Sequence, residues 1–132
     1  MRILVLNWRD IRSPEAGGSE SHLHEILTRL VRRGHLATLL CSQFASRPGP
    51  SEETVDGVRT IRVGSWWNAH LTIPKAARRL LEAEPFDLVV DVINKIPFFA
   101  PTWSEVPVLA VVAVEHDGGR AHDAHEHRLG GS

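Results

Sequence analysis

The run Ile3-Leu4-Val5-Leu6, a polar loop and a helical pattern that starts near Ser19 together decide the fold of this chain. Four consecutive apolar residues are typical of a strand that is buried on both faces of a parallel sheet. We expect Ser19 to cap the helix, Glu20 to lie in its first turn and Gly34 to follow its last turn. One face of that helix carries apolar residues at helical spacing, namely Leu23, Ile26, Leu27, Leu30 and Val31. The chain therefore begins with the first half of a βαβ unit.

The same alternation of apolar runs and helical patterns continues along the chain. Further strands are predicted at residues 37–41, 58–63, 87–93 and 108–114. Thr72 and Pro74 open a second predicted helix, which Pro85 ends. Strands that alternate with helices form a parallel sheet with right-handed crossovers. The predicted fold class is therefore α/β, a Rossmann-like parallel sheet flanked by helices.

Two segments between these elements are predicted to be links, the first a loop and the second holding at most a short helix. Residues 47–56 contain two prolines and a glycine, and residues 94–107 are rich in proline and aromatic residues without clear periodicity. The predicted strand at residues 58–63 carries Arg59 and Arg62, so we place it towards an edge of the sheet.

Composition and charge exclude several classes of protein. The 132 residues hold 15 Lys and Arg against 16 Asp and Glu, so no basic footprint for nucleic acid is present. The lone cysteine, Cys41, excludes an internal disulfide framework, and we expect it to be a small buried hydrophobe. The first apolar run is too short for a signal peptide or a membrane span. We therefore expect a cytoplasmic protein without a transmembrane segment, whose full-length form could also be peripheral to the inner membrane.

The loop after the first predicted strand contains the pair Gly17-Gly18, at the edge where doubly wound sheets bind ligands. At a helix N-terminus the free backbone N–H groups favour an anion, and glycine lets a phosphate or sugar approach the backbone closely. The alternative is that both glycines only shape the strand-to-helix turn. The loop has neither the G-x-G-x-x-G spacing nor a Gly-Lys-Ser/Thr sequence, which excludes a dinucleotide fingerprint and a P-loop.

Two further pairs of residues are candidates for ligand binding. Asn94 and Lys95 follow a predicted central strand, where they are placed to bind a hydroxyl or phosphate or simply to cap the loop. Trp66 and Trp67 either stack on a sugar ring or fill the edge of the core. We expect one of these tryptophans to belong to the core and leave the other open.

Several of these pieces resemble one family. The motif Pro14-x-x-Gly17-Gly18-x-Glu20, the turn Arg33-Gly34-His35 and the strands that end at Ile93 and before His116-Asp117 resemble the N-terminal domain of family 4 glycosyltransferases. Those enzymes have the GT-B fold and act with retention. The resemblance covers residues 1–117, and it departs from the family at Leu36-Ala37, where an acidic residue and a valine are usual.

The resemblance implies a function and a set of site residues. Two Rossmann-like domains of such enzymes face each other, the N-terminal one holding mostly the acceptor and the C-terminal one the nucleotide-sugar. Gly17, Gly18 and Ser19 would then lie against the donor diphosphate or the acceptor. His116 matches a histidine of the reaction centre, which would hydrogen-bond the transferred sugar or the acceptor. The resemblance implies a nucleotide-sugar donor, a carbohydrate or lipid-linked acceptor, no catalytic metal and no other cofactor.

The donor-binding C-terminal domain of the family, with its two glutamates and basic residues, has no counterpart in these 132 residues. We therefore expect a truncated or frameshifted glycosyltransferase domain at 1–117 that is inactive alone, followed by a disordered, polar, His-rich tail at 118–132. Two alternatives stay open. The first is a stand-alone module that binds a nucleotide, phosphate or sugar without catalysis. The second is a non-functional fragment whose tail histidines, His122, His125 and His127, hold zinc or nickel, although their spacing matches no structural zinc motif.

Overall fold

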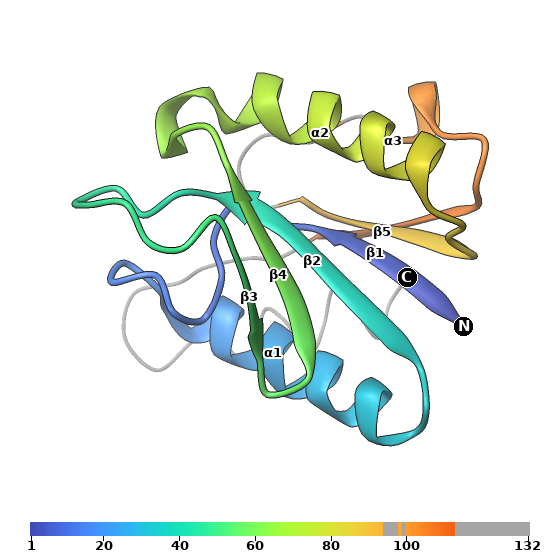
Figure 1. Cartoon of the computed structure of the whole chain (residues 1–132), viewed down its shortest axis with the longest axis horizontal. Coiled ribbons are helices and arrows are strands. Elements are labelled where there is room, and N and C mark those ends of the chain that lie inside the picture. The colour runs from blue at the N-terminus through green and yellow to red at the C-terminus, as the bar shows by residue number, and fades with distance from the viewer. Residues whose placement is uncertain (94–97, 99, 113–132) are drawn as a thin grey trace.

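The computed structural model describes residues 1–93, 98 and 100–112 and shows one mixed sheet with helices on its two faces (Figure 1). The elements in chain order are β1 (Arg2–Leu6), α1 (Gly18–Arg32), β2 (Leu36–Ser42), β3 (Glu52–Val55), β4 (Val58–Val63), the 3₁₀ turn η1 (Trp66–Asn68), α2 (Ala69–Ala83), β5 (Leu88–Ile93), α3 (Ala100–Trp103) and β6 (Val108–Val112). The α/β, Rossmann-like fold class is confirmed.

The strand order is β3-β4-β2-β1-β5-β6, and every neighbouring pair is parallel except β3 and β4. From β1 the chain first moves outward through α1 to β2, and it later returns through α2 to β5 on the other side of β1. Helices α1 and α2 cover opposite faces of the sheet (Figure 1). The order therefore reverses between β1 and β5, which is the topological switch point of a doubly wound sheet.

The alternation of side chains along β1 explains why its apolar run is continuous. Leu4 and Leu6 pack in the cluster under α2, whereas Ile3 and Val5 pack in the cluster under α1. All four are at most 4% exposed. The helices close the two clusters with Ile73 and Ala77 of α2 and with Leu27 of α1.

The predicted loop at residues 47–56 is partly wrong, because its second half forms the antiparallel edge strand β3. The turn between β3 and β4 has a positive φ at Asp56 (50°) and at Gly57 (84°), which is the backbone that a two-residue Asp-Gly hairpin requires. Strand β4 is accordingly second from the edge.

The predicted helix ends differ from the observed ones in two places. The N-cap of α1 is Gly17 rather than Ser19, and Glu20 Oε1 accepts the Gly17 N–H at 2.9 Å. Helix α2 begins at Ala69, before Thr72, and Pro74 lies inside it. The end of α1 is as predicted, because Gly34 follows it with a φ of 95°, the left-handed conformation usual after a helix.

Candidate functional site

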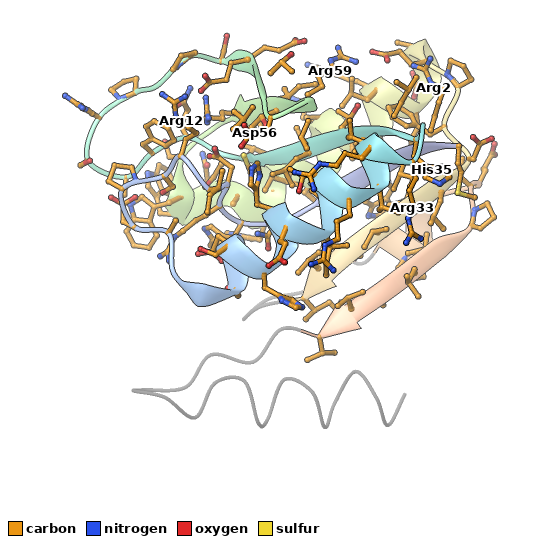
Figure 2. The ribbon with its side chains drawn as sticks, turned by 90° about the horizontal axis from the view of Figure 1, so that it is seen from below. Arg2, Arg12, Arg33, His35, Asp56 and Arg59 are labelled. Carbon is orange, nitrogen blue, oxygen red and sulfur yellow. The ribbon has the colours of Figure 1, made fainter. Side chains whose placement is uncertain are left out.

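The carboxyl ends of β1, β2, β4 and β5 meet at one edge of the sheet, where the loop of residues 7–17 leads from β1 to α1. This loop first continues along β2. Ser42 donates to the Trp8 carbonyl through its backbone N–H at 2.9 Å and through its hydroxyl at 2.6 Å. Arg12 of the loop lies at this edge, and Arg33 and His35 lie at the opposite end of α1 (Figure 2).

A buried ionic cluster ties this loop to the sheet. The guanidinium of Arg62 in β4 donates two hydrogen bonds to the Asp10 carboxylate, at 3.0 Å and 2.7 Å, and both side chains are at most 1% exposed. Arg62 also contacts Glu53 of β3 at 2.6 Å and the Pro50 carbonyl at 2.9 Å. Burial by itself lowers the pKa of Arg62, but the hydrogen bonds and charges of Asp10 and Glu53 outweigh it and raise that pKa. Arg62 therefore stays charged, and its contacts fix the loop to β4.

Further hydrogen bonds fasten the second half of the loop. The Asp10 carboxylate accepts the Arg12 backbone N–H at 3.0 Å. Glu15 accepts the Ser13 hydroxyl at 3.0 Å, and the same oxygen accepts the Ala45 N–H at 3.2 Å, from the loop after β2. The loop thus reaches α1 in a defined conformation.

Gly17 and Gly18 stand at the N-terminus of α1, and the fold itself does not require glycine at either position. A Cβ added to either residue would meet no atom within 4 Å. The φ of Gly17 is −123°, and Gly18 is the first helical residue, so both have conformations open to ordinary residues. The two glycines therefore leave the N-terminus of α1 accessible, and the packing of the fold does not require them.

Cys41 of β2 lies against the buried ionic cluster of Asp10 and Arg62. It is fully buried, and its thiol is 3.7 Å from Asp10 Oδ1 and from the Ile61 carbonyl. Burial, reinforced by the Asp10 charge, raises the pKa of the thiol well above its ordinary value. The prediction of a small buried hydrophobe is confirmed, because a neutral, inaccessible thiol packs and does not react.

Asp91 of β5 is the second buried carboxylate near the switch point. Its Oδ2 accepts the Ala100 N–H at 3.1 Å, which joins α3 to the sheet, and its Oδ1 has no hydrogen-bond partner within the described residues. Burial raises the pKa of Asp91, and the hydrogen bonds from the backbone of Ala100 and Phe98 only partly oppose this. The folded state therefore holds the proton of Asp91 more tightly than the unfolded chain does.

This shift predicts a pH-dependent cost to stability. The folded state binds more protons than the unfolded chain between the ordinary aspartate pKa and the raised pKa of Asp91, so the free energy of unfolding falls as the pH rises through that window. Asp91→Asn, which keeps an acceptor oxygen for Ala100, is expected to remove this fall. The measurement is urea unfolding from pH 4 to pH 8 on both proteins. Parallel pH profiles for the two would contradict the assignment.

A groove of about 410 Å³ lies on the α1 face of the sheet and extends from Met1 and His35 to Ser19 in the first turn of α1. Its walls are almost wholly apolar and come from α1 and from the middle of β5 and β6, with Leu23, Ile26, Val90 and Leu109 among them. A nucleotide or sugar needs convergent polar groups, and this groove exposes little polar surface although Ser19, His22 and His35 line it. The carboxyl edge is therefore the better candidate site.

The structure brings some of the predicted site residues together. Gly17, Gly18 and Ser19 form the first turn of α1 and its cap, at the carboxyl edge. Asn94, Lys95 and His116 lie outside the described residues. The expectation of a core position for one of the two tryptophans is wrong, because Trp66 is 48% and Trp67 66% exposed.

The ionic cluster was missed by the sequence reasoning, although a signal for it exists. Alternate residues of β4, namely Val58, Thr60 and Arg62, are the buried ones. An arginine on the buried face of a strand requires an acidic partner, and the loop of residues 7–17 at the carboxyl edge contains Asp10.

Neither a metal-binding cluster nor a membrane-spanning helix occurs in the part of the chain that the structure describes. No three His, Cys, Asp or Glu side chains gather as a metal site within residues 1–93, 98 and 100–112, and the tail histidines lie outside that part. None of the helices in the described part has the length and apolarity needed to cross a membrane.

Comparison with known proteins gives the family. The family model described as a Glycosyl transferase 4-like domain matches residues 17–131, which is most of the chain. A search of curated proteins gave no match. The match begins at the glycine pair and spans α1, the sheet from β2 onward and α2. With the fold and the glycine-capped helix, it shows that the chain belongs to the Glycosyl transferase 4-like domain family.

Proposed function

We propose that this chain is the acceptor-side domain of a retaining glycosyltransferase that transfers a hexosyl group from a nucleotide-sugar to a carbohydrate or lipid-linked acceptor. A second, C-terminal domain of the GT-B type would hold the nucleoside of the donor, and this chain would bind the donor's diphosphate. Gly17 and Gly18 would face the diphosphate of the donor across the cleft between the two domains. The family membership supports a transferase, and doubly wound sheets generally bind ligands at the carboxyl edge, where the glycine pair lies.

The glycine pair is the observation that carries this proposal. Glu20 accepts the Gly17 N–H, but the following backbone N–H groups and the dipole at the start of α1 favour an anion, and two missing side chains allow a diphosphate to approach them. The buried Asp10–Arg62 pair holds the loop in place before the ligand arrives, which lowers the entropic cost of binding. In the same proposal Asn94 and Lys95 bind a hydroxyl or phosphate, and His116 hydrogen-bonds the transferred sugar or the acceptor.

Gly18→Val tests this use of the glycine pair. The open space around Gly18 means that the variant folds, while its side chain blocks the close approach of a diphosphate. We expect its affinity for the nucleotide to fall by about tenfold or more, the equivalent of one lost charge-assisted hydrogen bond. Calorimetric titration with UDP, GDP, ADP and dTDP and their glucose conjugates measures the effect.

Ala83→Val, at the exposed C-terminal end of α2, is the matched control, because it adds the same side chain at the opposite edge of the sheet. Its affinity should equal that of the unaltered chain. If Gly18→Val binds as tightly as this control, or if none of the nucleotides binds, the proposed function is wrong.

A further inference from the structure

Trp66 and Trp67 form an exposed aromatic pair in η1, just after β4. Their side chains are 48% and 66% exposed, although tryptophan is mostly buried on average. Neither of them packs in the two core clusters of the described residues. Adjacent exposed indoles contribute little to folding, and such surfaces mark places where a partner binds.

The backbone of this pair is held rigidly. The indole N–H of Trp8, from the loop after β1, donates to the Trp66 carbonyl at 2.7 Å. The Ser65 N–H donates to Asn68 Oδ1 at 2.7 Å, which closes the turn. The turn also requires Gly64, because its φ is 57° and a Cβ there would lie 2.5 Å from Thr72 Oγ1. The backbone that carries the two indoles is therefore fixed, which favours binding because little backbone freedom is lost when a ligand binds.

Trp66 lies close to the switch point of the sheet, because it is hydrogen-bonded to Trp8. Trp8 follows β1, and its ring lies 6.5 Å from that of Phe98, which follows β5. The hydrogen bond from Trp8 thus connects Trp66 to the segments that follow β1 and β5, the two strands at the switch point. In Figure 1 the segment between β4 and α2 lies at the same edge of the sheet as the loop between β1 and α1.

The chemistry of the segment fits a neutral, hydroxyl-rich ligand. Residues 64–74 contain no Lys, Arg, Asp or Glu, and they offer the polar side chains of Ser65, Asn68 and His70. A sugar ring combines an apolar C–H face, which stacks on an indole, with hydroxyl groups, which such side chains bind. The helix turns basic only farther along, at Lys75, Arg78 and Arg79.

We propose that Trp66 and Trp67 are a stacking platform for a sugar ring of the acceptor. This inference rests on the proposed function, and it assigns the acceptor class to neutral carbohydrate at this position. The acceptor ring lies on the indoles, and the loop of residues 7–17, which contains Trp8, joins this position to the proposed diphosphate position at Gly17 and Gly18.

The test uses the whole chain, labelled with ¹⁵N so that each tryptophan gives one indole N–H signal. The four signals, from Trp8, Trp66, Trp67 and Trp103, are assigned with single Trp→Phe variants. Maltose, cellobiose, lactose, mannobiose and chitobiose are the probes. We expect a saturable shift of the Trp66 or Trp67 signal with at least one of them and no shift of Trp103. Trp67→Ala should weaken that binding about fivefold, as expected for one lost stacking contact.

Leu71→Ala is the matched control, since Leu71 is 66% exposed, as Trp67 is, and lies in the same segment. It should leave the saccharide affinity unchanged. Absence of an indole shift with every disaccharide would overturn the proposal. Binding to vesicles of phosphatidylglycerol and phosphatidylcholine that is lost in Trp67→Ala, without a saccharide response, would also overturn it and assign the pair to a lipid surface.

The same sample separates this proposal from the proposed function. The backbone N–H signals of Gly17 and Gly18 report on the added nucleoside diphosphates independently of the indoles. A nucleotide response without a saccharide response would leave the proposed function standing and remove the platform alone.

Discussion

Arg62→Met is expected to lower the free energy of unfolding by about 3–5 kcal/mol, because it leaves the Asp10 carboxylate buried without its cation. Methionine fills a similar volume, so the loss arises from charge and hydrogen bonding rather than from a cavity. Glu53 and the Pro50 carbonyl lose a partner too. Urea unfolding followed by far-ultraviolet circular dichroism measures the change.

Two further variants separate charge from packing. Asp10→Leu combined with Arg62→Met removes both buried charges, and it should cost less than Arg62→Met alone. Arg29→Met breaks an exposed ion pair with Glu25 in α1 and should change stability by less than about 0.5 kcal/mol. If Arg62→Met costs no more than Arg29→Met, the buried pair does not hold the loop.

Phe98→Ala is expected to destabilise the domain by about 3–5 kcal/mol, the usual cost of deleting a fully buried aromatic ring. Phe98 is 2% exposed and packs in the cluster under α2, where its ring lies beside Trp8. Its carbonyl also accepts the Trp103 indole N–H at 2.9 Å. Thermal and urea unfolding give the change in stability.

The half-buried Phe86 provides the comparison for this variant. Its ring lies 5.7 Å from the Arg2 guanidinium and contacts the same cluster only from its border. Phe86→Ala should cost about half as much or less, because less apolar surface is lost. Equal costs at the two positions would contradict the burial of Phe98 and the closed packing beside Trp8.

The central sheet and α1 could be predicted from the sequence because local pattern and packing agree there. The run Ile3-Leu4-Val5-Leu6 needs two apolar environments, and the structure supplies one on each face. Gly34 marks the end of α1 because only a residue tolerant of positive φ fits after the last turn. Strand β3 was missed because an edge strand needs few apolar residues, and charged residues such as Glu52 and Glu53 are also typical of loops.

The candidate site was predicted only in part, because its supports are contacts between distant segments. The glycine pair was evident from the motif, but the Asp10–Arg62 pair joins residues 52 positions apart. The capping partner of α1 was misassigned because both Ser19 and Glu20 can reach the helix end, and Glu20 binds the Gly17 N–H. The position of Trp66 depends on the long-range hydrogen bond from Trp8, which no local pattern reveals.

The most direct test of the central claim is a map of backbone N–H shifts on the ¹⁵N-labelled chain during titration with the nucleoside diphosphate that binds most tightly. We expect the largest shifts at Gly17, Gly18 and Ser19, where α1 begins at the carboxyl edge of the sheet. Signals at the opposite end of α1, such as Arg33 and Gly34, should stay in place. Largest shifts at the β5 and β6 walls of the apolar groove, or no shift at the start of α1, would contradict the account.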